Sequence, residues 1–123
     1  MRVFRYLRLS LLMGAALIYA VACGAGGPPA TGAAPSAGCT GSGGTPVGIA
    51  DFTFNPRSAS AAVNGVVTWT NADSAPHTVT FDGGPDCGRL AQGQAVSRTF
   101  TTAGTFTYKC TIHPTMTGSV IVQ

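Results

Sequence analysis

The chain has 123 residues, of which 45% are hydrophobic and only 9% are charged. This length is enough for one domain and argues against a large enzyme. The formal net charge of +3 comes from Arg2, Arg5 and Arg8, because the four other cationic residues balance the four Asp residues. A nucleic-acid-binding surface needs clustered cations that neutralise phosphates, so we expect no nucleic-acid partner.

Residues 1–22 have the pattern of an export signal. Three arginines precede an apolar run from Leu9 to Ala22, and basic residues followed by apolar ones are typical of signal peptides. The run is too short for a membrane-spanning helix, which needs about 20 residues. Ala20 and Ala22 before Cys23 resemble the lipobox of bacterial lipoproteins, in which the cysteine becomes the acylated N-terminus. The same small residues suit ordinary signal peptidase, so a plain secreted protein is the alternative.

Residues 23–44 have the composition of a flexible tether. From Gly24 to Gly44 the chain holds eight Gly, five Ala and three Pro, with no charged or aromatic residue. Such a segment buries too little apolar surface to offset its ordering entropy. As a flexible coil it would span about 25 Å, root-mean-square. We therefore expect a tether that holds a domain, residues 45–123, near a membrane.

The remaining sequence predicts strands. Six short runs rich in Val, Thr, Phe and Tyr are separated by turn residues, and no run has a helical pattern. The runs are 47–54, 66–71, 77–82, 95–101, 105–110 and 118–122. Many short antiparallel strands of this kind are typical of a β-sandwich or a small barrel. The expected fold class is all-β.

The alternation of side chains sorts the faces of these strands. Phe106 and Tyr108 alternate with threonines and share a face with Cys110, so Cys110 points inward. By the same period of two, His77 shares a face with Val79. Each of these two rows of inward-facing side chains therefore contains one potential metal ligand, Cys110 in the first and His77 in the second. The aromatic residues at inward positions are expected in the core: Trp69, Phe100, Phe106 and Tyr108.

Four residues have the chemistry of a copper site. Cys110-x-x-His113-x-x-Met116 places a thiolate, an imidazole and a thioether in one loop, and His77 supplies a second imidazole. Two imidazoles and a thiolate with a weak axial thioether accept both copper oxidation states. Zinc prefers more thiolates or histidines and gains little from Met. The sequence thus predicts one copper ion. The alternative is a metal-free domain in which these residues only fill space.

From about residue 47 onward the chain resembles the cupredoxins, or blue copper proteins, and within them the plastocyanin, pseudoazurin and amicyanin group. The resembling segments are 52–56, 63–73, 77–79 and 104–114. The resemblance implies a Greek-key β-sandwich with one type 1 copper, held by His77, Cys110 and His113 and capped by Met116. The short spacing of the ligand loop looks like that of amicyanin. The implied function is one-electron transfer outside the cytoplasm, not enzymatic catalysis.

The resemblance also implies roles for residues next to the ligands. The family uses an Asn at the place of Asn71 to hydrogen-bond the ligand loop, although a turn-forming Asn is an alternative. In the family the histidine at the place of His113 exposes a ring edge through which electrons pass. Pro76 and Pro114 would make the surrounding surface apolar and nearly uncharged, which suits brief redox encounters. The expected partners are a cytochrome, an oxidase or a dehydrogenase, and the expected state is a monomer.

Two cysteines have no role in this scheme. Cys23 is the expected lipid site and Cys110 the copper thiolate, which leaves Cys39 and Cys87. We expect them to form a disulfide, because disulfides persist in exported proteins. A free thiol or an intermolecular bond is the alternative.

Other functions agree less well with the residues present. Copper carriers favour exchangeable Met-rich or His-rich sites, and multicopper oxidases and copper nitrite reductases need more histidines than the two in this chain. A Cys-His hydrolase would need a carboxylate that orients His113. Electron transfer is therefore the leading hypothesis, with extracytoplasmic copper handling as the alternative.

Overall fold

The structure, a computed structural model, describes residues 38–123. The expected signal peptide, Cys23 and most of the expected tether lie outside these residues. Within the described part every regular element is a strand. Residues 38–123 contain no helix of the length and hydrophobicity that a membrane crossing requires.

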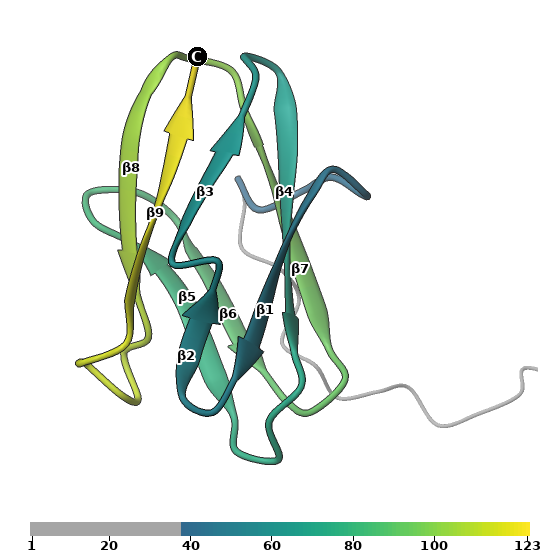
Figure 1. Ribbon diagram of the computed structural model, residues 1–123, viewed down its shortest axis with the longest axis vertical. Helices are drawn as coiled ribbons and strands as arrows, with labels where there is room; N and C mark the ends of the chain where they lie inside the picture. Colours follow the sequence, from purple (N-terminus) through teal and green to yellow (C-terminus); the bar gives the residue numbers. More distant parts are fainter. Residues whose placement is uncertain (1–37) are drawn as a thin grey trace, which may run out of the picture.

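Nine strands form two sheets that pack face to face (Figure 1). They are β1 (Thr45–Ala50), β2 (Thr53–Asn55), β3 (Ser58–Ala61), β4 (Gly65–Asn71), β5 (His77–Phe81), β6 (Asp86–Leu90), β7 (Ala95–Phe100), β8 (Gly104–Lys109) and β9 (Thr117–Val122). One sheet has the order β2-β1-β4-β7 and the other β3-β9-β8-β5-β6. The all-β sandwich expected from the sequence is confirmed.

The strand pattern differs from the sequence-based expectation in two places. Residues 47–54 do not form one strand, because Asp51 and Phe52 have positive φ angles of 52° and 56°. These angles reverse the chain, and β1 pairs antiparallel with β2. The sequence also does not predict β3 and β6. Their residues, Ser-Ala-Ser-Ala and Asp-Cys-Gly-Arg-Leu, have low strand propensity, and their pairing with β9 and β5 stabilises them.

Two strand pairs are parallel, where the sequence predicts antiparallel neighbours. β1 runs parallel to β4, and β3 runs parallel to β9. Both pairs join strands that are distant in sequence, so neither requires a tight hairpin. The other pairs are antiparallel.

The core lies between the inner faces of the two sheets and is rich in aromatic rings. The Trp69 and Tyr108 side chains are at most 1% exposed, and their ring centroids are 5.3 Å apart in an edge-to-face contact. Phe54 and Phe81 pack edge-on or tilted against Tyr108. Contacts of this kind add to the free energy gained from apolar burial. Phe106, expected in the core, is partly buried against it.

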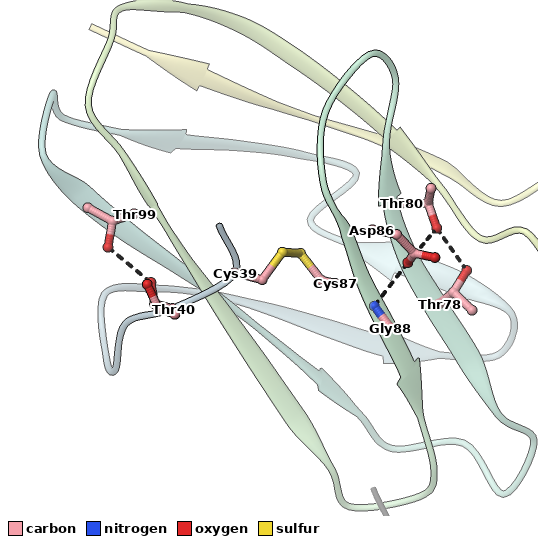
Figure 2. The surroundings of a disulfide bond; sticks show 8 residues. All are labelled: Cys39, Thr40, Thr78, Thr80, Asp86, Cys87, Gly88 and Thr99. Atoms are coloured by element: carbon pink, nitrogen blue, oxygen red, sulfur yellow. Dashed lines mark hydrogen bonds between the residues drawn. A yellow bond between two sulfur atoms is a disulfide. The ribbon is translucent and has the colours of Figure 1, made fainter. Parts of the chain in front are cut away.

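The segment before β1 is packed onto the domain. Cys39 is 2% exposed and forms a disulfide with Cys87 of β6, with their Cα atoms 5.4 Å apart (Figure 2). The Thr99 hydroxyl donates a hydrogen bond to the Thr40 carbonyl, as Figure 2 also shows. The described end of the expected tether, residues 38–44, is thus fastened to the domain. The disulfide and the hydrogen bonds offset the low apolar content of this segment.

Candidate metal centre

The strand order brings the four predicted ligands to one end of the sandwich. His77 is the first residue of β5, and Cys110 directly follows β8. These two strands are antiparallel neighbours, so the start of one lies beside the end of the other. His113 and Met116 lie in the loop that joins β8 to β9. In Figure 1 this loop and the β4–β5 loop are both at the lower end of the molecule.

Three donor atoms converge at this end. The Cys110 Sγ atom is 3.8 Å from His77 Nδ1 and 3.7 Å from His113 Nδ1, and the two Nδ1 atoms are 3.2 Å apart. Atoms at these separations lie on a circle with a radius of about 2.1 Å, close to the bond lengths of about 2.0 to 2.3 Å that imidazole nitrogen and thiolate sulfur form with a metal ion. The residues therefore fit one ion in a trigonal arrangement.

The ligand loop is short and closed on itself. The Met116 N–H donates to the His113 carbonyl at 2.9 Å, and the Cys110 N–H donates to the Met116 carbonyl at 3.0 Å. Pro114 lies in the turn between them and is exposed. Cys110 and His77 are fully buried and Met116 is 4% exposed, whereas His113 is partly exposed. Of these four side chains, only that of His113 has a substantial exposed surface.

Thr78 connects the β5 strand to the ligand loop. Its backbone N–H donates to Cys110 Sγ at 3.3 Å. Its hydroxyl oxygen accepts a hydrogen bond from the Thr111 N–H at 2.7 Å. Sequence reasoning does not identify Thr78, because its side chain is on the opposite face from His77. Its position directly after a ligand is the one signal that could have found it.

Asp73 holds the outer nitrogen of His77. The His77 Nε2 atom is 2.9 Å from Asp73 Oδ2. A proton on Nε2 shared with this carboxylate leaves the Nδ1 lone pair free for a metal ion. Hydrogen bonds from the Phe52 N–H first, and from the Asp51 N–H and His77, lower the pKa of Asp73 and outweigh the opposing effect of burial. The carboxylate is therefore ionised over the neutral pH range. Its backbone donors Asp51 and Phe52 are distant in sequence, but His77 is only four positions away, a spacing that sequence reasoning missed.

Asn71 supports a different loop from the one expected. Its side-chain amide donates to the Ala75 and Leu90 carbonyls, and its oxygen accepts from the Asp73 N–H. Within the described residues it makes no hydrogen bond to the ligand loop, so that expectation is wrong. Asn71 instead orders the loop that carries Asp73 and leads into His77. It is fully buried, and the three bonds satisfy its polar atoms.

Phe52 is a further residue that the sequence does not identify as part of the site. Its ring is 52% exposed and contacts the His77 and His113 rings edge-on, with centroids 5.4 and 4.9 Å apart. Ile112, 42% exposed, adds a second large apolar side chain to the ligand loop. The expectation of a nearly uncharged surface around the site is wrong, since Asp73 lies against His77 and the exposed Asp51 precedes Phe52.

Comparison with protein families agrees with the donor geometry. Residues 43–123 match the family of copper binding proteins of the plastocyanin/azurin type. The chain belongs to this family. The family assignment covers both sheets, the ligand loop and all four predicted ligands.

Individual amicyanins are similar over about two thirds of this chain. Amicyanin-alpha of Methylorubrum extorquens is 37% identical over 87 residues, which are 66% of this chain and 73% of the relative. Amicyanin of Paracoccus denitrificans is 39% identical over 83 residues, 63% of each chain. Solved structures of a reduced and an oxidised amicyanin variant, both 34% identical, superpose with TM-scores of 0.64 and 0.63 over 68% of this chain and 86% of theirs.

Family membership and geometry together define the cofactor. The protein has a single type 1 copper site formed by His77, Cys110, His113 and Met116. The nitrogen and sulfur donors select copper, and the thioether of Met116 distinguishes this set from a structural zinc site. The predicted cofactor is thereby confirmed.

Proposed function

We propose that this protein is a one-electron carrier that works outside the cytoplasm and exchanges electrons with other redox proteins. The observation that carries this proposal is the buried triangle of two imidazoles and one thiolate, with a single ligand, His113, at the surface. When bound, copper supplies a Cu(II)/Cu(I) couple in such a donor set. No substrate-binding group is needed for this function.

The surroundings of the ligands suit rapid electron exchange. Asp73 fixes the His77 ring, Thr78 donates to the Cys110 sulfur, and two backbone hydrogen bonds close the ligand loop. Donor atoms held in this way have little freedom to rearrange when the oxidation state changes. The partly exposed imidazole of His113 is the part of the site that a partner can contact directly.

The exposed side chains near His113 suit a short-lived complex. Phe52 and Ile112 present apolar area beside the histidine. A small, partly apolar contact is typical of redox encounters, which bury less surface than stable complexes. We propose a redox protein such as a cytochrome, an oxidase or a dehydrogenase as the partner.

Copper handling without electron transfer is less consistent with the site. A protein that passes copper to another needs ligands that exchange readily, whereas Cys110 and His77 are fully buried here and Met116 is nearly so. Hydrolysis by Cys110 is also disfavoured, because its sulfur is inaccessible and the carboxylate of Asp73 contacts His77 instead of His113.

We further propose that the protein is exported and lipid-anchored at Cys23. The export-type pattern of residues 1–22 and a disulfide between Cys39 and Cys87 support export, since disulfides persist outside the cytoplasm. Cells that express the protein are grown with labelled palmitate, and we expect label in the wild type and none in Cys23→Ser. A wild-type protein without label contradicts the anchor and favours a plain secreted protein.

The function is tested by adding Cu(II) to the purified protein. We expect an intense blue absorption band and an EPR spectrum with narrow copper hyperfine splitting. Cys110→Ser removes the band. The matched control, Cys39→Ser with Cys87→Ser, retains it, because these two sulfurs form the disulfide and are not copper ligands. A reversible one-electron wave in voltammetry distinguishes electron transfer from copper handling. A colourless complex, or rapid loss of copper to a chelator, contradicts the proposal.

A further inference from the structure

Asp73 accepts three hydrogen bonds from two separate parts of the copper end. Its Oδ1 atom accepts from the Asp51 N–H at 2.8 Å. Its Oδ2 atom accepts from the Phe52 N–H at 3.0 Å and lies 2.9 Å from His77 Nε2. The Asp73 carboxylate thus joins the copper ligand His77 to the β1–β2 turn, whose residues Asp51 and Phe52 are 22 and 21 positions before Asp73.

The β1–β2 turn has an unfavourable backbone that needs such support. Asp51 and Phe52 both have left-handed φ angles, 52° and 56°, although neither is glycine. Side chains with a Cβ atom disfavour this conformation, and Phe is a poor choice for it. Strained backbone retained next to a site points to a role in that site. The Asp73 carboxylate is the group that binds the amides of both strained residues.

The strained turn places the Phe52 ring against both copper histidines. The ring meets His77 and His113 edge-on at centroid distances of 5.4 and 4.9 Å, yet half of its own surface is exposed. Phe52 therefore borders the one ligand that reaches the surface. The position of this ring depends on the turn, and the turn depends on Asp73.

We propose that Asp73 is a positioning residue that sets the copper potential through His77 and, through the Asp51–Phe52 turn, holds the Phe52 ring beside the exposed ligand. This inference rests on the proposed electron-transfer function. The negative charge near His77 stabilises Cu(II) more than Cu(I), because Cu(II) carries the larger charge. The same carboxylate therefore couples the electronic properties of the site to the shape of the surface that a partner meets.

Asp73→Asn separates this role from a generic loss of charge. An Asn side chain has one oxygen, which can replace Oδ2 and accept from Phe52 and His77. Its NH₂ group then faces the Asp51 N–H, so two donors meet and the turn loses one bond. In the opposite orientation of the amide, the oxygen replaces Oδ1, and the hydrogen bonds of Phe52 and His77 to Oδ2 are both lost. The matched control is Asp82→Asn, which removes the same charge from an exposed residue directly after β5, the strand whose first residue is His77.

The first measurement is amide hydrogen exchange of the copper-free protein. We expect the Asp51 amide to exchange at least about tenfold faster in Asp73→Asn and at the wild-type rate in Asp82→Asn. In the Cu(I) form, we expect Asp73→Asn to weaken the NOE between the Phe52 and His113 rings. Unchanged exchange and an unchanged NOE would overturn the link to the turn.

The second measurement is the reduction potential by voltammetry. We expect Asp73→Asn to shift the equilibrium about tenfold toward Cu(I), which is about 59 mV for one electron, and Asp82→Asn to shift it much less. Equal shifts in both variants would overturn the effect through His77. If Asp73→Asn does not fold, the same measurements are made with Asp51→Gly added, because glycine accepts the left-handed backbone.

The two proposals fail in different ways. A wild-type protein without a blue band overturns the electron-carrier function. The hydrogen-exchange result does not require copper, so it tests the link between Asp73 and the turn by itself. A blue wild type with no response to Asp73→Asn overturns only the role of Asp73.

Discussion

At the scale of single residues, Thr78 shows how one position contacts both a buried copper ligand, Cys110, and the start of the ligand loop. Its backbone contacts the Cys110 sulfur and its hydroxyl contacts the first residue of the ligand loop after that cysteine. The peptide N–H is present whatever the side chain, whereas the contact with Thr111 depends on the hydroxyl. Substitution of Thr78 therefore tests the side-chain link alone.

We expect Thr78→Val to lower the free energy of unfolding by about 1 kcal/mol, because the Thr111 N–H loses a 2.7 Å acceptor in a partly buried site. Copper should also dissociate faster, measured by transfer to a chelator. Thr70→Val is the matched control, since Thr70 is exposed on β4 and should change stability by less than about 0.5 kcal/mol. Equal effects in both variants would show that the hydroxyl contributes nothing to the site.

Asp82 provides a test of pH dependence away from the copper. The Thr107 hydroxyl first, and then Lys109, lower the pKa of this carboxyl. A carboxyl with a lowered pKa in the folded state stabilises the protein above its unfolded pKa, about 3.9. That stabilisation is lost as the pH falls through the lower, folded-state value. We expect the urea midpoint of the copper-free protein to fall less between pH 6 and pH 3 in Asp82→Asn than in the wild type, and an identical fall would contradict this.

At the scale of elements, β8 and β9 approach closely at one point. A Cβ atom at Gly118 of β9 would lie 2.5 Å from the Tyr108 ring of β8, which is fully buried. The tyrosine ring packs against Phe54, Trp69 and Phe81, so a shift away from Gly118 would disturb the core. Gly118 is therefore required for the packing of the sheet directly after the ligand loop.

We expect Gly118→Ala to lower the free energy of unfolding by about 3 kcal/mol, at the upper end of the range for overpacked cores. Gly48→Ala on β1 is the matched control, because its nearest contact would be an ordinary 3.7 Å. Urea unfolding of both variants measures the difference. A Gly118→Ala protein as stable as Gly48→Ala would show that Tyr108 can shift.

The elements also show what the sequence could predict and what it could not. Residues inside the sandwich follow a period of two, so the inward positions of His77 and Cys110 were predictable, and their buried state confirms them. Asp73 contacts His77 directly from the β4–β5 loop, whereas Phe52 meets both histidines from a turn whose left-handed backbone no propensity favours. β3 pairs with β9 although its own residues have low strand propensity. Contacts of this kind depend on the tertiary fold and leave no local signal.

At the scale of the whole molecule, the disulfide closes the chain into a large loop. Cys39 and Cys87 are 48 positions apart, and both are nearly fully buried. Replacing both with Ser should lower the free energy of unfolding by about 4 kcal/mol from chain entropy at this separation. Urea unfolding of the copper-free protein with and without reductant measures it. In the Cu(II) form of the double variant, without reductant, the blue band should persist. Equal stability of the oxidised and reduced forms would contradict the expectation.

The chain joins the folded domain at a point remote from the ligands. Gly38 lies against Pro85 in the turn after β5, while His77 is the first residue of that strand. A five-residue strand is about 17 Å long. The molecule therefore has a rear, where the N-terminal segment attaches, and a front, where the copper ligands lie. Residues 38–44 therefore leave the front uncovered, so a partner can reach His113 there.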